Sequence, residues 1–434
     1  MAFGWSKTSL PVAGSRTDDV YFVSEAVGWA VNSDGRIYFT SDGGMTWVVQ
    51  TLLAASYLRC LGFSSVTNGW VGALSGPHRL YRTTDGGATW APVTNLPPEG
   101  PARICGIFAV SDNIVFASGT NYPNEPAAVL RTTDGGVSWD VLKLGGMPAL
   151  LVDIYFEDAL SGWVVGAIDD VAHPGRPRQR RDVVPAVFHT SDGGETWTNQ
   201  TEANTQSEEF PRGEWGWKFH KLGDTLFVSC ENFLDGAFLR SDDRGASWQR
   251  LRVNDQQRNS NLEGIGFVDM QTGWVGGWGD SLFEGGFTSA TEDGGQNWEN
   301  AKHVGFRLNR FRFLGDPVST GYASGDTVYK YSDPPSAPLL VGAAAEDVPD
   351  IDGFDSVSID VDVIPNADRL TVRLWERFGR EVRLLVDETD PVPGQRLITW
   401  DFRDDSGETL PPGGFVMRIV QGATSISRII HRRT

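Results

Sequence analysis

The octapeptide Thr40-Ser41-Asp42-Gly43-Gly44-Met45-Thr46-Trp47 is the most informative stretch of this 434-residue chain, because the chain contains six copies of it. The other copies run over 83–90, 132–139, 190–197, 241–248 and 291–298. They recur about every 50 residues, a period typical of propellers and other tandem repeats. The Asp carboxylate accepts hydrogen bonds within the turn, Gly supplies a positive φ, and Trp gives an apolar anchor. Each copy therefore predicts a β-hairpin.

The turn of each copy is expected to use up the polar side chains of the repeat, so we predict a structural role for them rather than a catalytic one. These structural residues are Asp42, Asp85, Asp134, Asp192, Asp243 and Asp293, with Trp47, Trp90, Trp139, Trp197, Trp248 and Trp298.

Two further strands precede each hairpin. The nearer one reads Gly28-Trp29-Ala30-Val31 in the first unit and returns with variations in the others. The farther one is centred on a phenylalanine in each unit: Phe22, Phe63, Phe108, Phe156, Phe219 and Phe267. Together with the hairpin they make four strands per unit, which is the composition of a propeller blade.

A seventh unit is divided between the two ends of the repeat region. Residues 310–331 supply three strands and then meet Pro334-Pro335 instead of a hairpin. Gly4-Trp5-Ser6-Lys7 resembles the strand that follows each repeat, so we expect it to complete the seventh blade and close the ring. This predicts an all-β, seven-bladed propeller over 1–333. A six-bladed ring would follow if 308–331 were a linker.

These repeats resemble the Asp-box, or BNR repeat, of sialidases, sortilin-type receptors and related propellers. The alternation of Gly-Trp strands with Thr-x-Asp-Gly-Gly-x-Thr-Trp is most similar to the photosystem II stability/assembly factor family and its bacterial relatives. The resemblance covers about residues 1–333 and implies a propeller that binds a partner.

The composition changes after Tyr331. A Pro-rich stretch begins a linker over 334–353, and residues 354–434 show alternating strands without the repeat, which predicts a small β-sandwich. The segments 374–382, 400–407 and 410–416 resemble the Ig-like domain of the flagellar hook-capping protein. That resemblance implies a role in secretion, for example as type IX secretion cargo, or in anchoring or assembly, and it implies a bacterial origin.

The formal net charge of −19 argues against nucleic acid as a partner. No run of apolar residues is long enough to span a membrane, and the first residues have neither the basic start nor the apolar core of a signal peptide. Because Trp5 is assigned to a blade, we expect an export signal to be absent from this numbering. We expect an extracellular, cell-surface or periplasmic protein.

Three cysteines are present, and Cys60 and Cys105 occupy equivalent places in neighbouring units. We expect buried free thiols, with a disulfide between these two as the alternative. No spacing of Cys and His suggests a metal site, and we expect no cofactor, although a structural cation at the repeats stays open.

The binding face should carry the unequal loops, and the largest insertions fall at 169–182 and 202–217. The expected ligand-binding residues are Arg59, Arg103, His173, Arg178, Glu214, Trp215, Trp217, Trp278 and Arg310. Asp19, Asp153 and Glu263 are expected to join a charged ring at the channel mouth. Charged groups beside exposed aromatic rings suit a protein or a glycan partner.

The sequence therefore favours an exported, non-enzymatic binding propeller, with a role as a subunit of a cell-surface or photosynthetic assembly as one alternative. The other alternative is a glycoside hydrolase or lyase, which needs two carboxylates. Its candidate catalytic residues would be Asp153, Asp169, Glu214 and Glu263. The sialidase arginine triad and its early Phe-Arg-Ile-Pro-like motif are not found, so no catalytic residue is assigned.

Overall fold

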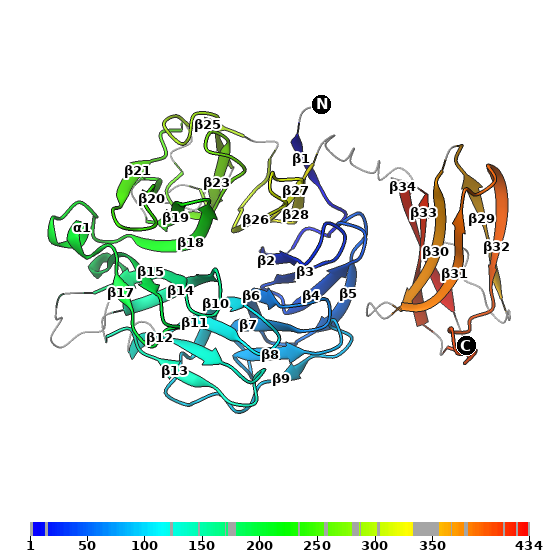
Figure 1. The fold of residues 1–434 in the computed structure, drawn as a ribbon, viewed down its shortest axis with the longest axis horizontal. Helices are drawn as coiled ribbons and strands as arrows, with labels where there is room; N and C mark the ends of the chain where they lie inside the picture. Colours follow the sequence, from blue (N-terminus) through cyan, green and yellow to red (C-terminus); the bar gives the residue numbers. More distant parts are fainter. Residues whose placement is uncertain are drawn as a thin grey trace.

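The computed structural model describes residues 3–13, 16–121, 125–145, 148–169, 171, 179–232, 235–255, 259–279, 286, 288–301, 304–332, 356–365, 367–376, 381–410, 413–421 and 424–432. The expected linker 334–353 lies outside these residues. Strands dominate the described part, and Figure 1 shows those between residues 4 and 332 as sheets arranged around a common centre.

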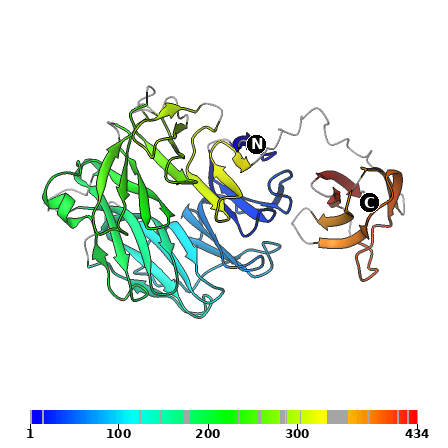
Figure 2. The same ribbon diagram turned by 45° about the horizontal axis from the view of Figure 1, so that its top comes forward.

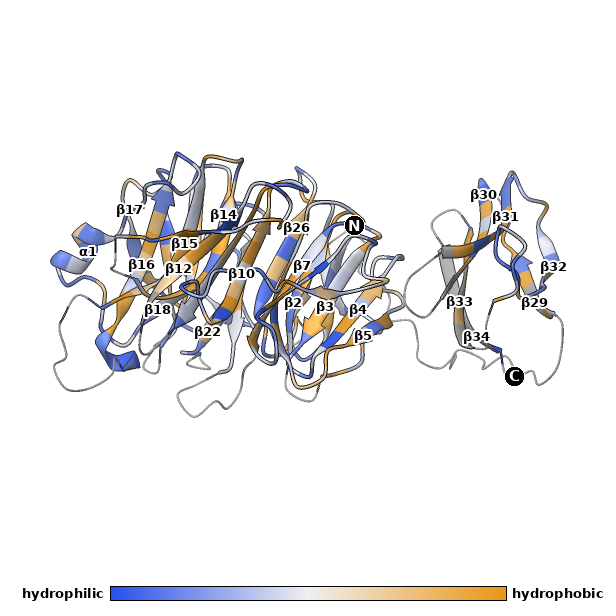
Figure 3. Cartoon of the chain, turned by 90° about the horizontal axis from the view of Figure 1, so that it is seen from below, coloured by the Kyte–Doolittle hydropathy of each residue, from blue (hydrophilic) through white to orange (hydrophobic). Residues whose placement is uncertain are grey.

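Seven four-stranded antiparallel sheets lie between Gly4 and Ser332, and in six of them the strands follow chain order. These six are β2–β5 (Thr17–Phe22, Gly28–Asn32, Arg36–Thr40, Val48–Leu52), β6–β9 (Tyr57–Phe63, Gly69–Ser75, Leu80–Thr83, Ala91–Pro92), β10–β13 (Arg103–Ala109, Val115–Asn121, Glu125–Thr132, Asp140–Leu142), β14–β17 (Pro148–Phe156, Gly162–Ile168, Val184–Thr190, Thr198–Asn199), β18–β21 (Trp215–Leu222, Thr225–Glu231, Ala237–Ser241, Gln249–Arg252) and β22–β25 (Leu262–Phe267, Gly273–Gly277, Ser289–Thr291, Glu299–Asn300). The helical segments are η1 (Arg180–Asp182) and α1 (Glu202–Gln206), and α1 is coloured hydrophilic in Figure 3.

The seventh sheet joins the two ends of the ring. Its order is β1-β28-β27-β26, where β1 is Gly4–Lys7, β26 is Arg310–Leu314, β27 is Thr320–Ser324 and β28 is Val328–Ser332. Gly4 pairs with Ser332 and Lys7 pairs with Tyr329, so the N-terminal strand covers an edge that would otherwise be open. Residues 308–331 thus supply three strands, as the seven-blade prediction requires. Figure 2 shows the same closure from a tilted view.

Stacked aromatic rings join neighbouring blades. Trp29 stacks on Phe63 of the next blade with ring centroids 3.7 Å apart, and Phe116 and Phe156 repeat the contact at 3.7 Å. Tyr322 of the seventh blade stacks on Phe22 of the first at 3.4 Å. The Phe and Gly-Trp strands of the sequence therefore mark the contacts between blades.

The glycine before each tryptophan has a steric reason. A Cβ at Gly28 would lie 2.5 Å from the ring of Phe22, and a Cβ at Gly69 would lie 2.2 Å from the ring of Phe63. No side chain fits at that distance, so glycine leaves room for the phenylalanine of its own blade.

Each Asp-box closes its turn with its own side chains. The Asp42 carboxylate accepts hydrogen bonds from the Thr46 amide (2.8 Å), the Thr46 hydroxyl (2.5 Å) and the Thr40 hydroxyl (2.7 Å). Gly43 and Gly44 have φ of 68° and 84°, which only glycine adopts without strain. In the box of the fifth blade, Arg244 takes the first of these positions, with φ of 57°.

The C-terminal strands form two sheets around one apolar core. One sheet pairs β29 (Val357–Val363) with β32 (Gly394–Trp400), and the other has the order β31-β30-β33-β34 (Glu381–Thr389, Arg369–Glu376, Gly413–Gln421, Thr424–Arg432). Val361, Leu374, Trp400 and Met417 share the core between them. The likeness of this part to an Ig domain stays a prediction.

Candidate functional site

A pocket of about 430 Å³ opens at the centre of the propeller. Its walls come from the starts of the first strands and the ends of the second strands of the blades, which is the face expected from the strand order. The lining residues are Arg16, Tyr57, Arg59, Leu74, Arg103, Cys105, Thr120, Leu150, Val152, Arg180, Trp215, Trp217, Glu231, Glu263 and Trp278. The pocket therefore brings together six of the seven blades.

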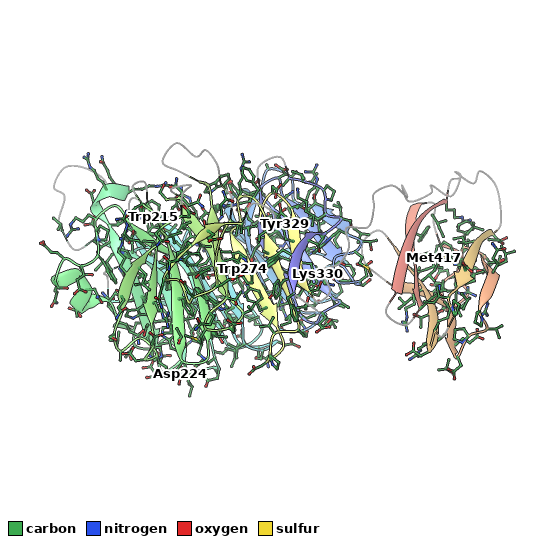
Figure 4. All side chains as sticks on the ribbon, turned by 90° about the horizontal axis from the view of Figure 1, so that it is seen from above. Trp215, Asp224, Trp274, Tyr329, Lys330 and Met417 are labelled. Carbon is green, nitrogen blue, oxygen red and sulfur yellow. The ribbon has the colours of Figure 1, made fainter. Side chains whose placement is uncertain are left out.

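The Asp-boxes lie on the opposite side. Arg244 of the fifth box forms an ion pair of 3.1 Å with Asp224, in the β18–β19 turn. Figure 4 shows Trp215, a pocket residue, near one side of the propeller and Asp224 near the other. The repeat thus supports the scaffold away from the pocket.

An arginine lies over the ring of each pocket tryptophan. The guanidinium of Arg16 is 4.5 Å from the ring centroid of Trp278, within the range of a cation–π contact. Equivalent contacts join Arg59 to Trp217 (4.8 Å) and Arg180 to Trp215 (5.0 Å). These contacts hold three cationic groups in the pocket wall.

Asp18 binds two of these arginines. Its Oδ1 accepts hydrogen bonds from Arg16 Nη2 (2.9 Å) and from Arg59 Nη1 (2.7 Å), and all three side chains are buried. Arg59 Nη2 is buried without a hydrogen-bond partner. An unpaired guanidinium donor in a pocket wall is a ready partner for an acceptor atom of a ligand.

Two carboxylates line the same pocket but differ in their partners. Glu263 forms an ion pair with Arg16, and its Oε1 accepts a hydrogen bond of 2.9 Å from Trp278 Nε1. Glu231 accepts a hydrogen bond of 3.1 Å from Trp215 Nε1 and forms an ion pair of 3.8 Å with Arg180 Nη1. Burial, and then repulsion from Glu263, raise the pKa of Glu231 to about 8.

A buried ion cluster lies beside the pocket without lining it. Arg310 binds both oxygens of Asp153, at 2.7 and 2.6 Å, and its Nε is 3.2 Å from Asp19. Burial alone would raise the pKa of Asp153, but Arg310 and Lys218 outweigh it and lower the pKa to about 2. Burial, with repulsion from Arg310, lowers the pKa of Lys218 to about 8.

Six of the residues singled out in the sequence meet in the pocket: Arg59, Arg103, Trp215, Trp217, Glu263 and Trp278. His173 and Arg178 lie outside the described residues. Asp169 is partly exposed at the end of the fourth blade's second strand and does not line the pocket.

Three expectations need correction. Arg310 and Asp153 are buried and form an ion pair with each other, so Arg310 is not available as the expected ligand contact. The lowered pKa of Asp153 leaves this candidate catalytic residue without a proton to donate at neutral pH. Glu214 is fully buried and pairs with Arg250 at 2.8 Å and with Asn232 at 2.5 Å. It precedes Trp215 by one residue, and adjacent residues of a strand point to opposite sides.

The sequence did not single out Arg16, Tyr57, Arg180 or Glu231 as site residues. One signal for Glu231 was available, because it is a charged residue at the end of an otherwise uncharged, buried second strand, on the side of the channel mouth. Arg16 stands directly before the first strand of the first blade, which is also on the side of the channel mouth. Both belong to the loop ends that the strand order assigns to this face.

Cys60, Cys105 and Cys230 are buried free thiols, as expected, and Cys105 lines the pocket. In the part of the chain that the structure describes, no three His, Cys, Asp or Glu side chains are grouped so that they could hold a metal ion. Nor does any helix there have the length and hydropathy to cross a bilayer.

Comparison with known proteins shows which propellers this chain resembles. The family model described as photosynthesis system II assembly factor YCF48 matches residues 1–144. The solved structure of YCF48 bound to D1 peptide is 18% identical, with a TM-score of 0.53 over 76% of this chain and 96% of that one. YCF48 from Cyanidioschyzon merolae is also 18% identical, with a TM-score of 0.55 over 76% and 99%. The chain thus contains a BNR-type β-propeller that resembles the photosystem II assembly factor.

An ancestral GH74 enzyme is 11% identical, with a TM-score of 0.54, over 98% of this chain and 63% of that one. At these identities the likeness extends to the fold alone. No curated protein matches the sequence.

Proposed function

We propose that the propeller is a non-enzymatic receptor that binds an anionic segment of a partner protein in the channel-mouth pocket. The observation that carries this proposal is the convergence of four arginines and three tryptophans on one pocket of about 430 Å³. The family likeness supports it, since one related propeller has been solved with a bound peptide.

The charge of the pocket contrasts with that of the chain. The whole chain has a formal net charge of −19, whereas Arg16, Arg59, Arg103 and Arg180 outnumber the two carboxylates of the pocket lining. A cationic hollow in an acidic protein attracts an anionic group and repels a cationic one. Arg180 and Arg181, at 54% and 72% side-chain exposure, extend the basic surface outward along η1.

A protein segment fits the pocket better than a neutral glycan. Sugars bind through the open faces of aromatic rings, but an arginine already lies over each pocket tryptophan. These arginines instead present donors to carboxylates.

The second candidate is a glycoside hydrolase, and one observation favours it. Glu231 and Glu263 share the pocket, and a carboxyl whose pKa is raised, placed beside a second carboxyl, is the arrangement of a general acid and its partner. Asp153, Asp169 and Glu214 do not take part in that pair.

A rhodamine-labelled hexaglutamate peptide tests the receptor. In fluorescence anisotropy we expect the wild-type protein to bind this peptide and not to bind hexaglutamine. Its affinity for hexaglutamate should fall as salt is added. Arg103→Gln together with Arg180→Gln should weaken binding roughly tenfold, since two cationic groups of the pocket are removed. Both side chains are exposed or half-exposed, so the fold should persist.

Arg36→Gln is the matched control, because Arg36 is exposed and does not line the pocket. Equal loss in both variants would refute the pocket as the binding site. Tighter binding of oligogalacturonate than of hexaglutamate would assign an acidic glycan instead. Release of reducing sugar from xyloglucan that stops in Glu231→Gln and Glu263→Gln would establish the hydrolase.

We further propose that the protein is exported and that residues 354–434 serve secretion, anchoring or assembly. The hook-capping resemblance of those residues supports this role. A fusion of residues 354–434 to a reporter, followed for its location in the source cell, tests it. Retention of the fusion in the cytoplasm would contradict the proposal. A subunit role in a surface or photosynthetic assembly is the alternative, and neighbouring genes for secretion or photosystems would discriminate.

A further inference from the structure

The two pocket carboxylates offer a means of control. Glu231 ends β19 and Glu263 lies in β22, so neighbouring blades place both groups on one pocket. Only 3% of Glu231 and 2% of Glu263 is exposed. Two carboxylates with so little solvent around them repel each other when both are charged.

Their partners decide which of the two takes up a proton. Glu263 has the guanidinium of Arg16 and the indole of Trp278 as close donors. Glu231 has the indole of Trp215, while Arg180 lies at 3.8 Å, beyond hydrogen-bond distance, and is 54% exposed to water. With so few close donors, buried Glu231 favours its neutral form.

We propose that Glu231 is a proton-linked gate, so that the pocket binds its anionic ligand with a proton on Glu231 and releases it when that proton is lost. This inference rests on the proposed receptor function. Ionisation of Glu231 would add a negative charge to the wall that meets the ligand. A bound anion would in turn hold the proton on Glu231, because the two effects are thermodynamically reciprocal.

Among the groups around Glu231 that line the pocket, Glu231 is the one whose charge we expect to change near pH 8. Glu263 approaches from β22, Arg16 precedes β2, Arg59 comes from β6 and Arg180 from η1, and the arginines keep their charge at all relevant pH values. Burial raises the pKa of Tyr57 and of Cys105 in the lining, so both stay neutral near pH 8. Lys218 loses its charge in the same range as Glu231, but it lies outside the lining.

The sign follows from the raised pKa of Glu231. Below about pH 8 the carboxyl is neutral and the pocket is most cationic, and above it the pocket gains a negative charge. The affinity for hexaglutamate, whose own carboxylates are ionised throughout, should fall about tenfold from pH 6.5 to pH 9.5, since a shift of one pKa unit on binding corresponds to a factor of ten. Proton uptake on binding at pH 8 should appear in calorimetry as a dependence on the ionisation enthalpy of the buffer.

Glu231→Gln keeps the shape of the neutral carboxyl. At both pH 6.5 and pH 9.5 it should therefore bind hexaglutamate with nearly the affinity that the wild type has at pH 6.5. On binding it should take up less than half as many protons as the wild type. We expect any pH dependence that remains in Glu231→Gln to come from Lys218. The double variant Glu231→Gln/Lys218→Met should therefore bind without pH dependence. If Glu231→Gln retains the full pH dependence of the wild type, the gate is refuted. Binding of hexaglutamate at unchanged affinity across this range refutes the gate alone, whereas no binding at any pH refutes the receptor itself.

Discussion

Trp5→Ala should destabilise the propeller by about 3–5 kcal/mol, the usual cost of deleting a large buried aromatic side chain. Trp5 is 9% exposed and packs against Trp274, Phe311 and Tyr331, with ring centroids 5.3–5.6 Å away. These rings come from the sixth and seventh blades, so one side chain of the N-terminal strand packs against its own blade and against the neighbouring one. Urea unfolding followed by circular dichroism measures the loss.

Phe3→Ala is the matched control. Phe3 is 41% exposed and stacks on Tyr331 at 5.0 Å, so its removal should cost less than about 1 kcal/mol. Equal stability of Trp5→Ala and wild type would mean that the N-terminal strand does not hold the ring closed.

Arg310→Met should cost about 3–5 kcal/mol for a different reason, because it leaves the buried carboxylates of Asp153 and Asp19 without their shared cation. The loss should shrink in acid. The folded pKa of Asp153 lies below its ordinary value of 3.8, so its ion pair stabilises the wild type above pH 3.8. That stabilisation disappears as pH falls towards 2, and the two proteins should then converge. Thermal unfolding from pH 7 to pH 2 follows this convergence.

Arg312→Met provides the comparison within the same strand. Arg312 lies over the ring of Tyr21 at 4.9 Å and donates to the Val20 carbonyl, and no carboxylate ion pair is among its described contacts. Its replacement should cost about 1 kcal/mol and change little with pH. A pH-independent loss in Arg310→Met would show that packing, and not charge, explains the role of Arg310.

The sequence predicts the scaffold well because the scaffold is local. The Asp-box turn closes on its own side chains, Gly28 and Gly69 meet the phenylalanine of their own blade, and Trp29 stacks on the phenylalanine of the next. Even the closing strand at Trp5 follows from its likeness to the strands after the boxes. These features repeat, so one copy explains the others.

The pocket is harder to predict because six blades supply single residues to it. Strand order identifies the face on which the pocket opens and finds Arg59, Trp217 and Trp278 in its lining. It cannot say which carboxylates point into the pocket and which are sealed in ion pairs. Glu214 and Glu231 show the difference, since Glu214 forms a buried ion pair with Arg250 and Glu231 lines the pocket.

The central claim is that the channel-mouth pocket is the binding site, and Cys105 tests it most directly. Cys105 lines the pocket and is 6% exposed, whereas Cys60 and Cys230 are fully buried. Methyl methanethiosulfonate converts a thiol to its methyl disulfide with release of methanesulfinate. This modification of Cys105, followed by mass spectrometry, should slow as hexaglutamate saturates the protein and should not respond to hexaglutamine. An unchanged rate at Cys105 while hexaglutamate is bound would place the binding site elsewhere.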